Sequence, residues 1–334
     1  MGNLISYYNT LKIKELVIIS DPVNQTLPIY HNTKTLAKVE EFLYDKNMSL
    51  TIIMPAYNEE KNLEILIPQL YKVLGKNIEI IVVDDASSDS TFQTAKKLQA
   101  KVIRNPYNMG NGASIKRGIR EAKNEVLVLM DADGQHLPSE IPKLLGELDD
   151  FDMIIGERDA KSQNWWRYWA NKIFNLLASY VSGVKVKDLT SGFRVVKKSK
   201  AMKFLYLLPN TFSYPSTLTL SFIKASYPVK FVPVKVEKRK RGRSKINLIS
   251  DGLRFLTIIL RIAVFFSPLK VFLPISLFFF LSGFLYYLYT FLNFHRFTNM
   301  SALLLTTSVI IFMLGLISEQ IANLRMEKIE NNDL

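Results

Sequence analysis

The stretch "VLVLMDADGQHLP", residues 126–138, decides the fold class of this 334-residue chain. Its apolar first half suits a buried strand, but the run stops at Asp131 and Asp133, which one alanine separates. Two like charges at a strand end are costly to bury unless they are paired or bind an ion. Carboxylates at positions i and i+2, with an amide such as Gln135 beside them, can hold a hard divalent cation. We therefore predict a metal site formed by Asp131, Asp133 and Gln135.

The same kind of pattern extends over residues 49–235, where predicted strands and helices alternate. The segments "LTIIMPAYNEE", "IEIIVVDDASSDST", "KVIRN" and "DMIIGER" predict further strands, and the segments between them have helical spacing. This alternation indicates an α/β domain with a mainly parallel sheet, whose ligand site lies beyond the carboxyl ends of the strands. Polar side chains mark that edge at four strands, which chance rarely produces: Tyr57, Asn58, Glu59, Asp84, Asp85, Asp131, Asp133, Glu157 and Arg158.

Two apolar runs near the C-terminus predict a transmembrane hairpin. Residues 271–292 and 300–318 contain no charged residue, and about 20 apolar residues suffice to cross a bilayer as a helix. Their short link and uniform apolarity favour a hairpin over two buried core helices. Lys and Arg gather on the near side, above all in "KRKRGRSK" at 238–245, whereas the link holds only Arg296. The positive-inside rule therefore predicts a cell-membrane protein with two spans, both termini and the large N-terminal part being cytoplasmic.

Two further segments, 164–183 and 246–268, have the pattern of amphipathic helices. In the first, Asn175 and Ser179 belong to a polar face, while Ile173, Leu176 and Tyr180 belong to an apolar one. Either segment could be a core helix of the α/β domain. The tryptophans and basic residues of the first segment favour an interfacial position, because aromatic rings and cations both suit the headgroup region.

The composition narrows the choice of partners. The chain has no cysteine, which excludes disulfides and a cysteine nucleophile, and its three histidines make a multi-histidine metal cage improbable. The formal net charge of +13 suits an anionic partner, such as nucleic acid, a phospholipid surface or a phosphorylated substrate. Nucleic acid is disfavoured, because the basic run adjoins the apolar spans rather than aromatic residues that could stack on bases.

Six segments, in their order along the chain, carry a family resemblance: "IIMPAYNEE", "IVVDDASSDST", "NPYNMGNGASIKRG", "DADGQH", "IGER" and "DLTSGFR". Over roughly residues 49–250 the chain resembles family-two glycosyltransferases of GT-A fold. Within them it is most similar to the polyprenyl-phosphate sugar synthases, the dolichol-phosphate mannose and glucose synthase group. The resemblance implies a nucleotide-sugar-binding GT-A domain with Mg²⁺ or Mn²⁺ as cofactor, followed by the membrane hairpin.

The resemblance also implies roles for individual residues. It places the nucleotide sugar against Pro55, Tyr57, Glu59, Val83, Asp85, Asp131, Ala132 and Lys245. It places the acceptor phosphate against Arg158, Ser191, Arg194 and Arg241. Asp84 joins the first set because its carboxylate can accept hydrogen bonds from a base or ribose. We expect Asp133, Arg158 and Arg194 to be the residues on which catalysis depends most.

The residue types agree with a phosphate acceptor. A sugar hydroxyl needs a general base before it can attack, whereas a phosphate monoester is already largely dianionic at neutral pH. Bringing two anions together takes cations, and the planar fork of arginine suits phosphate oxygens. Two alternatives concern single features: Arg194 could merely brace the "DLTSGF" turn, and "KRKRGRSK" could be a general anionic-lipid patch. For Asp188, at the start of that turn, we expect a structural role rather than that of a base.

We therefore expect an inverting glycosyltransferase that moves a hexose from a nucleotide sugar to dolichyl or polyprenyl phosphate for glycan or glycoprotein assembly. The donor stays open between UDP-glucose or UDP-N-acetylglucosamine and GDP-mannose, with "DADGQH" and "GNGASIKRG" closer to the UDP-sugar members. The alternatives are a processive polysaccharide synthase, a transferase for glycan hydroxyls and a non-catalytic nucleotide-sugar-binding membrane protein. The first lacks its Gln-x-x-Arg-Trp box here, and the second would want an acidic base late in the domain.

The expected domain organisation follows from these segments. Residues 1–48 form an N-terminal extension to which we assign no role, and 49–245 form the cytoplasmic transferase domain. Then come the second interfacial helix at 246–268, the transmembrane hairpin at 269–320 and a cytoplasmic tail at 321–334. Membrane lipids are expected partners, and the sequence leaves a homo-oligomer open.

Overall fold

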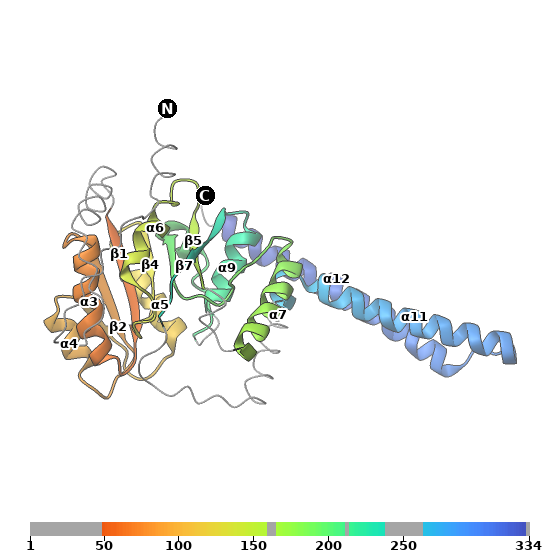
Figure 1. Ribbon diagram of the computed structural model, residues 1–334. Helices are drawn as coiled ribbons and strands as arrows, with labels where there is room; N and C mark the ends of the chain where they lie inside the picture. Colours follow the sequence, from red (N-terminus) through yellow and green to blue (C-terminus); the bar gives the residue numbers. More distant parts are fainter. Residues whose placement is uncertain (1–48, 159–164, 211–213, 238–262, 332–334) are drawn as a thin grey trace.

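A seven-stranded sheet forms the centre of the N-terminal domain in the computed structural model, which describes residues 49–158, 165–210, 214–237 and 263–331 (Figure 1). The strand order is β3-β2-β1-β4-β6-β5-β7. Strand pairs β1–β2, β1–β4, β2–β3 and β5–β7 are parallel, and β6 is antiparallel to both β4 and β5. The prediction of a mainly parallel sheet is confirmed. The strands are β1 (Leu50–Ala56), β2 (Glu79–Asp84), β3 (Lys101–Arg104), β4 (Val126–Leu129), β5 (Met153–Arg158), β6 (Arg194–Lys197) and β7 (Val229–Val234).

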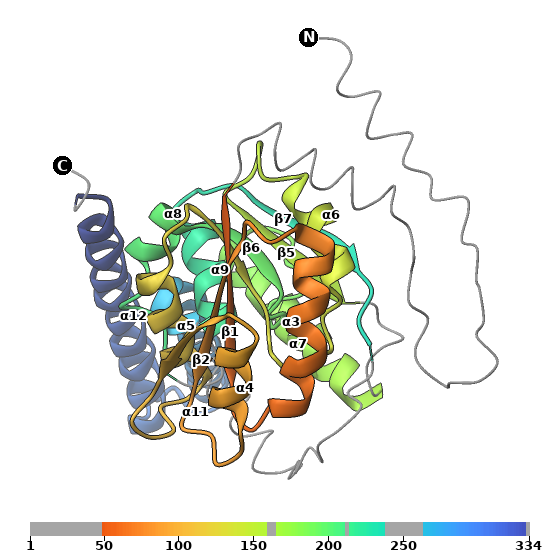
Figure 2. The ribbon, with the colours of Figure 1, turned by 90° about the vertical axis from the view of Figure 1, so that its left-hand side faces the viewer.

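Helices cover both faces of this sheet (Figure 2). On one face lie α3 (Glu60–Leu74), the short 3-10 helix η1 (Pro138–Glu140) and α6 (Ile141–Leu145), with α4 (Thr91–Lys97) beside α3. On the other lie α5 (Asn111–Glu121), α8 (Lys198–Lys203) and α9 (Tyr214–Lys224). The result is the three-layer arrangement that parallel βα units adopt.

Alternation along the strands explains the two core layers. In β1, Ile52 and Met54 face the layer that contains α3, whereas Ile53 faces the layer that contains α5. Successive side chains of a strand point to opposite faces, so both faces of a covered strand are apolar. Gly118 lets α5 approach the sheet closely, because a Cβ at this position would lie 2.3 Å from Ile53 Cγ2.

The sequence patterns did not predict β6 and β7, and β6 is antiparallel to both of its neighbours. It pairs with β4 and β5 in a register that sets Arg194 opposite both Leu129 and Ile155. Because β6 runs in the opposite direction, it begins at the edge where β4 and β5 end. The "SGFR" segment that leads into β6 is thereby delivered to the same edge as Asp131 and Arg158.

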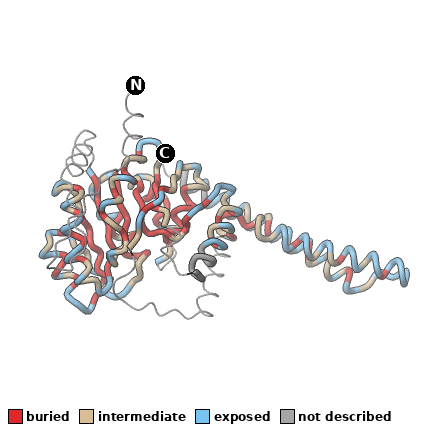
Figure 3. Tube along the Cα trace, viewed as in Figure 1, coloured by how far each residue is buried: buried red, intermediate tan, exposed pale blue. Residues whose placement is uncertain are grey.

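The C-terminal part forms a two-helix hairpin of α11 (Pro268–Phe294) and α12 (Asn299–Asn331), which projects from the α/β domain (Figure 1). Both helices are long and apolar enough to cross a membrane, and only 11% and 17% of their most apolar windows are buried (Figure 3). The predicted hairpin is confirmed. Helix α12 continues beyond the predicted end of its apolar run at 318 and reaches Asn331.

Helix α7 (Trp165–Ser182) corresponds to the first predicted amphipathic segment, and its orientation is informative. Phe174, Ala178 and Val181 pack against α9 and the start of the hairpin. Ile173 and Leu176 are exposed, the latter to 69% of its surface. The second predicted interfacial helix, 246–268, lies mainly outside the described residues, as do the extension at 1–48 and the basic run at 238–245.

Candidate functional site

Asp131 and Asp133 lie in the turn that follows β4. Asp131 is 36% exposed, and its Oδ1 accepts a hydrogen bond of 3.4 Å from the side-chain amide of Asn111. Its Oδ2 lies 3.8 Å from Nε2 of His136. Asp133 Oδ1 accepts a 3.1 Å hydrogen bond from the backbone N–H of Gln135. Gly134 closes this turn with φ of 72°, a left-handed conformation that suits glycine.

The surroundings of Asp131 keep it ionised. Burial alone would raise its pKa, but His136, the Asn111 amide and the charge of Arg158 outweigh burial, and the pKa of Asp131 lies below its ordinary value. Its carboxylate is therefore an anion at neutral pH. An ionised oxygen ligand is what a hard divalent cation requires.

The donor set fits a cation that shares its ligands with a substrate. The described residues contain no group of three or more His, Asp or Glu side chains suited to hold a metal by themselves. Asp131 and Asp133 offer two carboxylates, and Gln135 adds an amide two residues further on. Mg²⁺ and Mn²⁺ sites of this kind leave coordination positions for substrate phosphates and water. The predicted trio thus fits a metal that is completed by a bound diphosphate.

The backbone of the "SGFR" segment packs against the Asp131 carboxylate. A Cβ on Gly192 would lie 3.0 Å from Oδ2 of Asp131, so the backbone passes directly against the carboxylate. The neighbouring Ser191 is fully buried, and its hydroxyl has no hydrogen-bond partner in the described structure. Ser191 was predicted to contact the acceptor phosphate; its side chain lies beneath the surface of the site, and that role stays a prediction.

Arg158, at the end of β5, is held by an acidic partner that the sequence placed in a turn. Its Nε and Nη2 donate to the two oxygens of Asp188 at 2.8 and 2.9 Å, and its backbone N–H donates to the same carboxylate at 3.2 Å. Nη2 also donates to Thr190 Oγ1 at 2.5 Å. About a quarter of the Arg158 side chain, 24%, stays exposed. A fixed and partly accessible guanidinium at this edge suits an anionic ligand.

Arg194 differs from its predicted role as an acceptor-phosphate ligand and needs a correction. Its side chain is fully buried in β6. Nη1 donates to the carbonyl of Pro215 at 3.0 Å and to Thr219 Oγ1 at 3.2 Å, and Nη2 donates to the carbonyl of Ser191. These bonds tie the "SGFR" turn to α9. The structure thus favours the alternative in which Arg194 braces the turn.

The acidic pair at the end of β2 shapes the neighbouring loops. Asp84 is fully buried, accepts a 3.0 Å bond from the N–H of Ser87 and lies 3.3 Å from Nε of Arg104. Asp85 accepts hydrogen bonds from the N–H groups of Met109 and Gly110 at 2.8 and 2.9 Å. Asp84 was expected to contact the base or ribose, and its complete burial instead makes it a structural residue.

The other predicted nucleotide-binding residues lie along the same edge with different exposure. Tyr57 follows β1 and is half exposed, whereas Pro55 in β1 is only partly accessible. Val83 and Ala132 are buried. The backbone N–H of Glu59 donates to Thr91 Oγ1 at 2.9 Å, which ties the loop after β1 to the start of α4.

A short bridge brings the chain after β7 to the turn at 131–135, the predicted metal site. His136 forms an isolated antiparallel bridge with Val236, and the N–H of Glu237 donates to the carbonyl of Gln135 at 3.0 Å. The predicted Arg241 and Lys245 lie outside the described residues, but they follow Glu237 closely in the sequence. Glu237, the last described residue before the basic run, therefore lies beside the predicted metal site.

Two contributors to the site were not predicted. Asn111 was visible only as part of a glycine-flanked helix start, and His136 only as the last residue of "DADGQH". Neither pattern shows that both side chains approach the same carboxylate. Asn111 belongs to α5, and His136 is bridged to Val236 in the segment 235–237 that follows β7 (the β7 extension), so both contacts depend on segments that are distant in the sequence.

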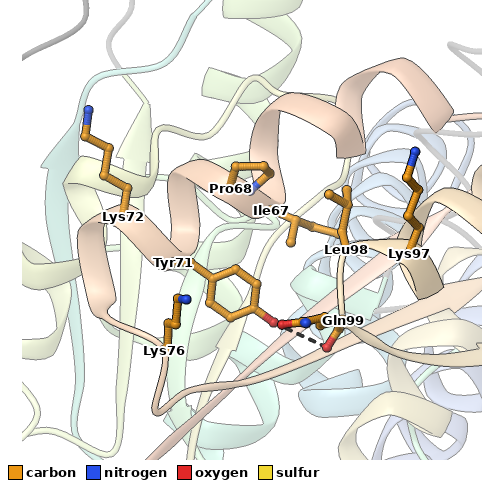
Figure 4. A pocket seen from close by; sticks show the side chains of 8 residues that line it. All are labelled: Ile67, Pro68, Tyr71, Lys72, Lys76, Lys97, Leu98 and Gln99. Atoms are coloured by element: carbon orange, nitrogen blue, oxygen red, sulfur yellow. Dashed lines mark hydrogen bonds between the residues drawn. The ribbon is translucent and has the colours of Figure 1, made fainter.

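A shallow groove between α3 and α4 lies apart from this site (Figure 4). It is lined by Pro68, Tyr71, Lys72 and Lys97 among others, and the Tyr71 hydroxyl donates to the carbonyl of Gln99 at 3.3 Å. The ends of α3 and α4 that line it are their C-terminal ends, which lie at the edge of the sheet opposite to Asp131. It contains no acidic side chain among its lining residues.

Comparison with known proteins agrees with this geometry. Residues 51–205 match the family model of glycosyl transferase family 2, and residues 267–324 match that of the GtrB C-terminal hairpin. The chain is 36% identical over 216 residues to a dolichol-phosphate mannosyltransferase of Pyrococcus furiosus, a match that covers 60% of each protein. It is 29% identical over 214 residues to a polyprenol monophosphomannose synthase of Mycolicibacterium smegmatis, covering 59% of this chain and 80% of that protein.

Among solved structures, glucosyl-3-phosphoglycerate synthase from Mycobacterium tuberculosis, in complex with Mn²⁺, UDP and phosphoglyceric acid, has a similar fold. The TM-score is 0.54 at 18% identity, over 69% of this chain and 82% of that one. At this identity the likeness establishes the GT-A type of fold alone. Together with the family models it assigns the class: residues 51–205 are a glycosyl transferase family 2 domain. The C-terminal part of the chain is a GtrB-type hairpin.

Proposed function

We propose that this glycosyltransferase moves a sugar from a nucleotide sugar to a polyprenyl phosphate, such as dolichyl phosphate, at a membrane surface. One observation carries the choice of acceptor: the pairing of Arg158 with Asp188. A hydroxyl acceptor needs a carboxylate base late in the domain. Asp188 is a carboxylate late in the domain that lies at this edge, and both its oxygens accept hydrogen bonds from Arg158. A phosphate acceptor needs no base and gains from the arginine.

The proposed step is a single displacement. An oxygen of the lipid phosphate attacks the anomeric carbon, the new C–O bond forms as the bond to the nucleoside diphosphate breaks, and the configuration inverts. The electron pair leaves with the diphosphate, so that no proton has to move. Arg158 draws the incoming anion to the edge of the sheet, and the turn at 131–135 fixes the diphosphate. Bound there by Asp131, Asp133 and Gln135, Mg²⁺ or Mn²⁺ would supply charge neutralisation for the leaving group.

The names of the relatives support the acceptor class. The archaeal relative is called a dolichol-phosphate mannosyltransferase and the mycobacterial one a polyprenol monophosphomannose synthase. The matched segment spans only 60% of the archaeal relative's own length, so the comparison supports the reaction class more than the details. Both names specify mannose, whereas the structural neighbour binds UDP. The donor is therefore the part of the proposal that most needs a direct assay.

The hairpin and α7 support a membrane location for the reaction. The polar face of α7 turns inward: Asn175 donates to the carbonyl of Lys187 at 2.5 Å and accepts from the N–H of Leu189 at 3.0 Å. Its apolar Leu176 and Tyr180 are left on the outside, next to the base of the hairpin. A helix that exposes its apolar face beside two membrane spans suits the headgroup boundary. We propose that the catalytic domain lies on the cytoplasmic side.

A donor panel tests the proposal. Full-length protein in detergent is incubated with Mn²⁺, polyprenyl phosphate and, in turn, radiolabelled GDP-mannose, UDP-glucose and UDP-N-acetylglucosamine. We expect label to enter the organic phase with one donor strongly preferred, and chelator to stop the transfer. A protein that labels no lipid with any of the donors, although Asp131 and Asp133 are intact, would contradict the proposed function.

A further inference from the structure

His136, the histidine of "DADGQH", lies beside the predicted metal ligand Asp131, and the proposed reaction assigns it no role. We propose that His136 is a positioning residue, which fixes the orientation of the Asp131 carboxylate and thereby strengthens divalent-metal binding. The inference rests on the proposed function insofar as Asp131 is a metal ligand. It adds a role for a residue that would not itself touch the metal.

Two groups lie close to Oδ2 of the Asp131 carboxylate. Nε2 of His136 lies 3.8 Å from this oxygen. The backbone of Gly192 approaches so closely that a Cβ there would lie 3.0 Å from it. The amide of Asn111 holds Oδ1. These contacts restrict rotation of a side chain that is otherwise a third exposed, and a restricted ligand loses less conformational freedom when a cation binds.

The imidazole itself is held in place from two directions. It stacks on the ring of Phe193, with ring centres 5.0 Å apart and planes inclined by 19°. Phe193 is in turn fixed by Gly156, where a Cβ would lie 2.9 Å from Cδ1 of the ring. The backbone of His136 is bridged to Val236. Rigid support of this kind is what a residue that orients a metal ligand requires.

The burial of the ring is a second, independent observation. His136 is only 6% exposed, and its Nδ1 has no hydrogen-bond partner in the described structure. A buried polar atom without a partner costs free energy, and a phenyl ring would fill the space against Phe193 without that cost. A histidine at this position therefore carries the free-energy cost of an unpaired Nδ1, and its other nitrogen, Nε2, lies near Asp131. We expect this arrangement if the role of His136 is to hold Nε2 beside the Asp131 carboxylate.

The test separates the polar role from packing. His136→Phe keeps the stacked ring and removes the N–H, whereas His136→Gln keeps an N–H donor and loses the ring. His295→Asn, in the link of the hairpin, is the matched control, because asparagine tolerates the left-handed backbone there (φ 52°). Mn²⁺ affinity is measured by the electron paramagnetic resonance signal of free Mn²⁺, with full-length protein in detergent, in parallel series with UDP and with GDP at one fixed concentration to complete the site, and with no sugar donor or lipid acceptor.

We expect His136→Phe to weaken Mn²⁺ binding about 10-fold, as loss of an outer partner of a metal ligand commonly does. His136→Gln should recover part of the affinity, and the control should bind like the wild type. Unchanged Mn²⁺ affinity in His136→Phe would overturn the inference, and so would an equal loss in both variants that follows their unfolding temperatures. Because neither donor nor acceptor is present, this result does not depend on which sugar or lipid the enzyme uses.

Discussion

Neighbouring residues fix the positions of the side chains in this site. Asp131 is oriented by Asn111 and Gly192, and Arg158 is held by Asp188. The residues that a sequence pattern marks as functional therefore divide into two kinds. Asp131, Asp133 and Arg158 remain accessible at the sheet edge, whereas Asp84 and Arg194 are buried and shape the loops.

The proposed metal site in the turn at 131–135 yields the first prediction. Asp133→Asn removes one anionic ligand but keeps the shape of the side chain, so the fold should survive while transfer falls at least about 100-fold, equivalent to roughly 3 kcal/mol of transition-state stabilisation. Transfer of labelled sugar at saturating Mn²⁺ and the unfolding temperature are measured together. Asp150→Asn, on an exposed loop, is the control. Wild-type activity in Asp133→Asn would contradict the metal assignment.

The buried arginine yields the second prediction. Arg194→Met removes three hydrogen bonds to the turn and α9, so the free energy of unfolding should fall by about 3 kcal/mol. Affinity for the nucleotide sugar and turnover with the lipid acceptor should then decline together, because the "SGFR" segment that packs against Asp131 becomes less well ordered. Lys185→Met, which changes an exposed cation, should leave stability and both substrates unaffected. A selective loss of acceptor turnover at full stability would restore the phosphate-binding role that the sequence suggested.

At the scale of elements, the sequence predicted the strands whose ends carry acids and the helices between them. It could not predict β6, because "RVVK" is too short to have a period of its own and forms a strand only through pairing with β4 and β5. The same limit explains the error at Arg194, since an arginine in a loop and one at the start of a central strand look alike in sequence. The approach of His136 to Asp131 likewise depends on the distant β7 extension.

Polar contacts at helix ends join the hairpin to the α/β domain and the two helices of the hairpin to each other. Lys270 Nζ donates to the carbonyls of Tyr180 and Val181 at the end of α7, at 2.8 and 3.1 Å. At the start of α11, the N–H of Leu269 donates to Glu319 of α12 at 3.0 Å. Unpaired N–H and C=O groups at helix ends need such partners, and a carboxylate is favoured at a helix N-terminus.

This junction yields the third prediction. Glu319→Ala leaves the first turn of α11 without its acceptor and should destabilise the protein by about 1 kcal/mol, the usual cost of losing a helix cap. Glu327→Ala, an exposed change in the same helix, is the matched control. Thermal unfolding in detergent should show a midpoint about 2–4 °C lower for Glu319→Ala only. Equal midpoints for both variants would mean that the contact between Leu269 and Glu319 does not stabilise the hairpin.

At the scale of the whole molecule, the exposed surface of the hairpin and the apolar face of α7 meet at one end of the α/β domain. Exposed apolar residues in such numbers are unusual for a surface in water. Arg158 and the turn at 131–135 lie in the same α/β domain. Helix α7 connects this domain to the hairpin. A lipid phosphate at the headgroup level and a water-soluble nucleotide sugar could thus meet without either leaving its own phase.

Topology is the fourth prediction. With two spans and a basic near side, the link at 293–299 should lie outside and the C-terminus inside. Because the chain has no cysteine, single cysteines at Phe297 and Asn331 report each side without background. An impermeant thiol reagent on intact cells should label the variant at 297, and the variant at 331 only after permeabilisation. Labelling of both from outside would rule out the hairpin orientation.

The measurement that tests the central claim most directly compares two acceptors of identical chain length, a polyprenyl phosphate and the corresponding polyprenol, with the donor that the panel identifies. A phosphate nucleophile predicts transfer to the phosphate only, giving a product from which mild acid releases the sugar. Arg158→Ala should slow this transfer about 10- to 150-fold, the loss of one hydrogen bond to a charged group, with donor affinity unchanged. Transfer to polyprenol at a comparable rate, giving an acid-stable glycoside, would contradict the account.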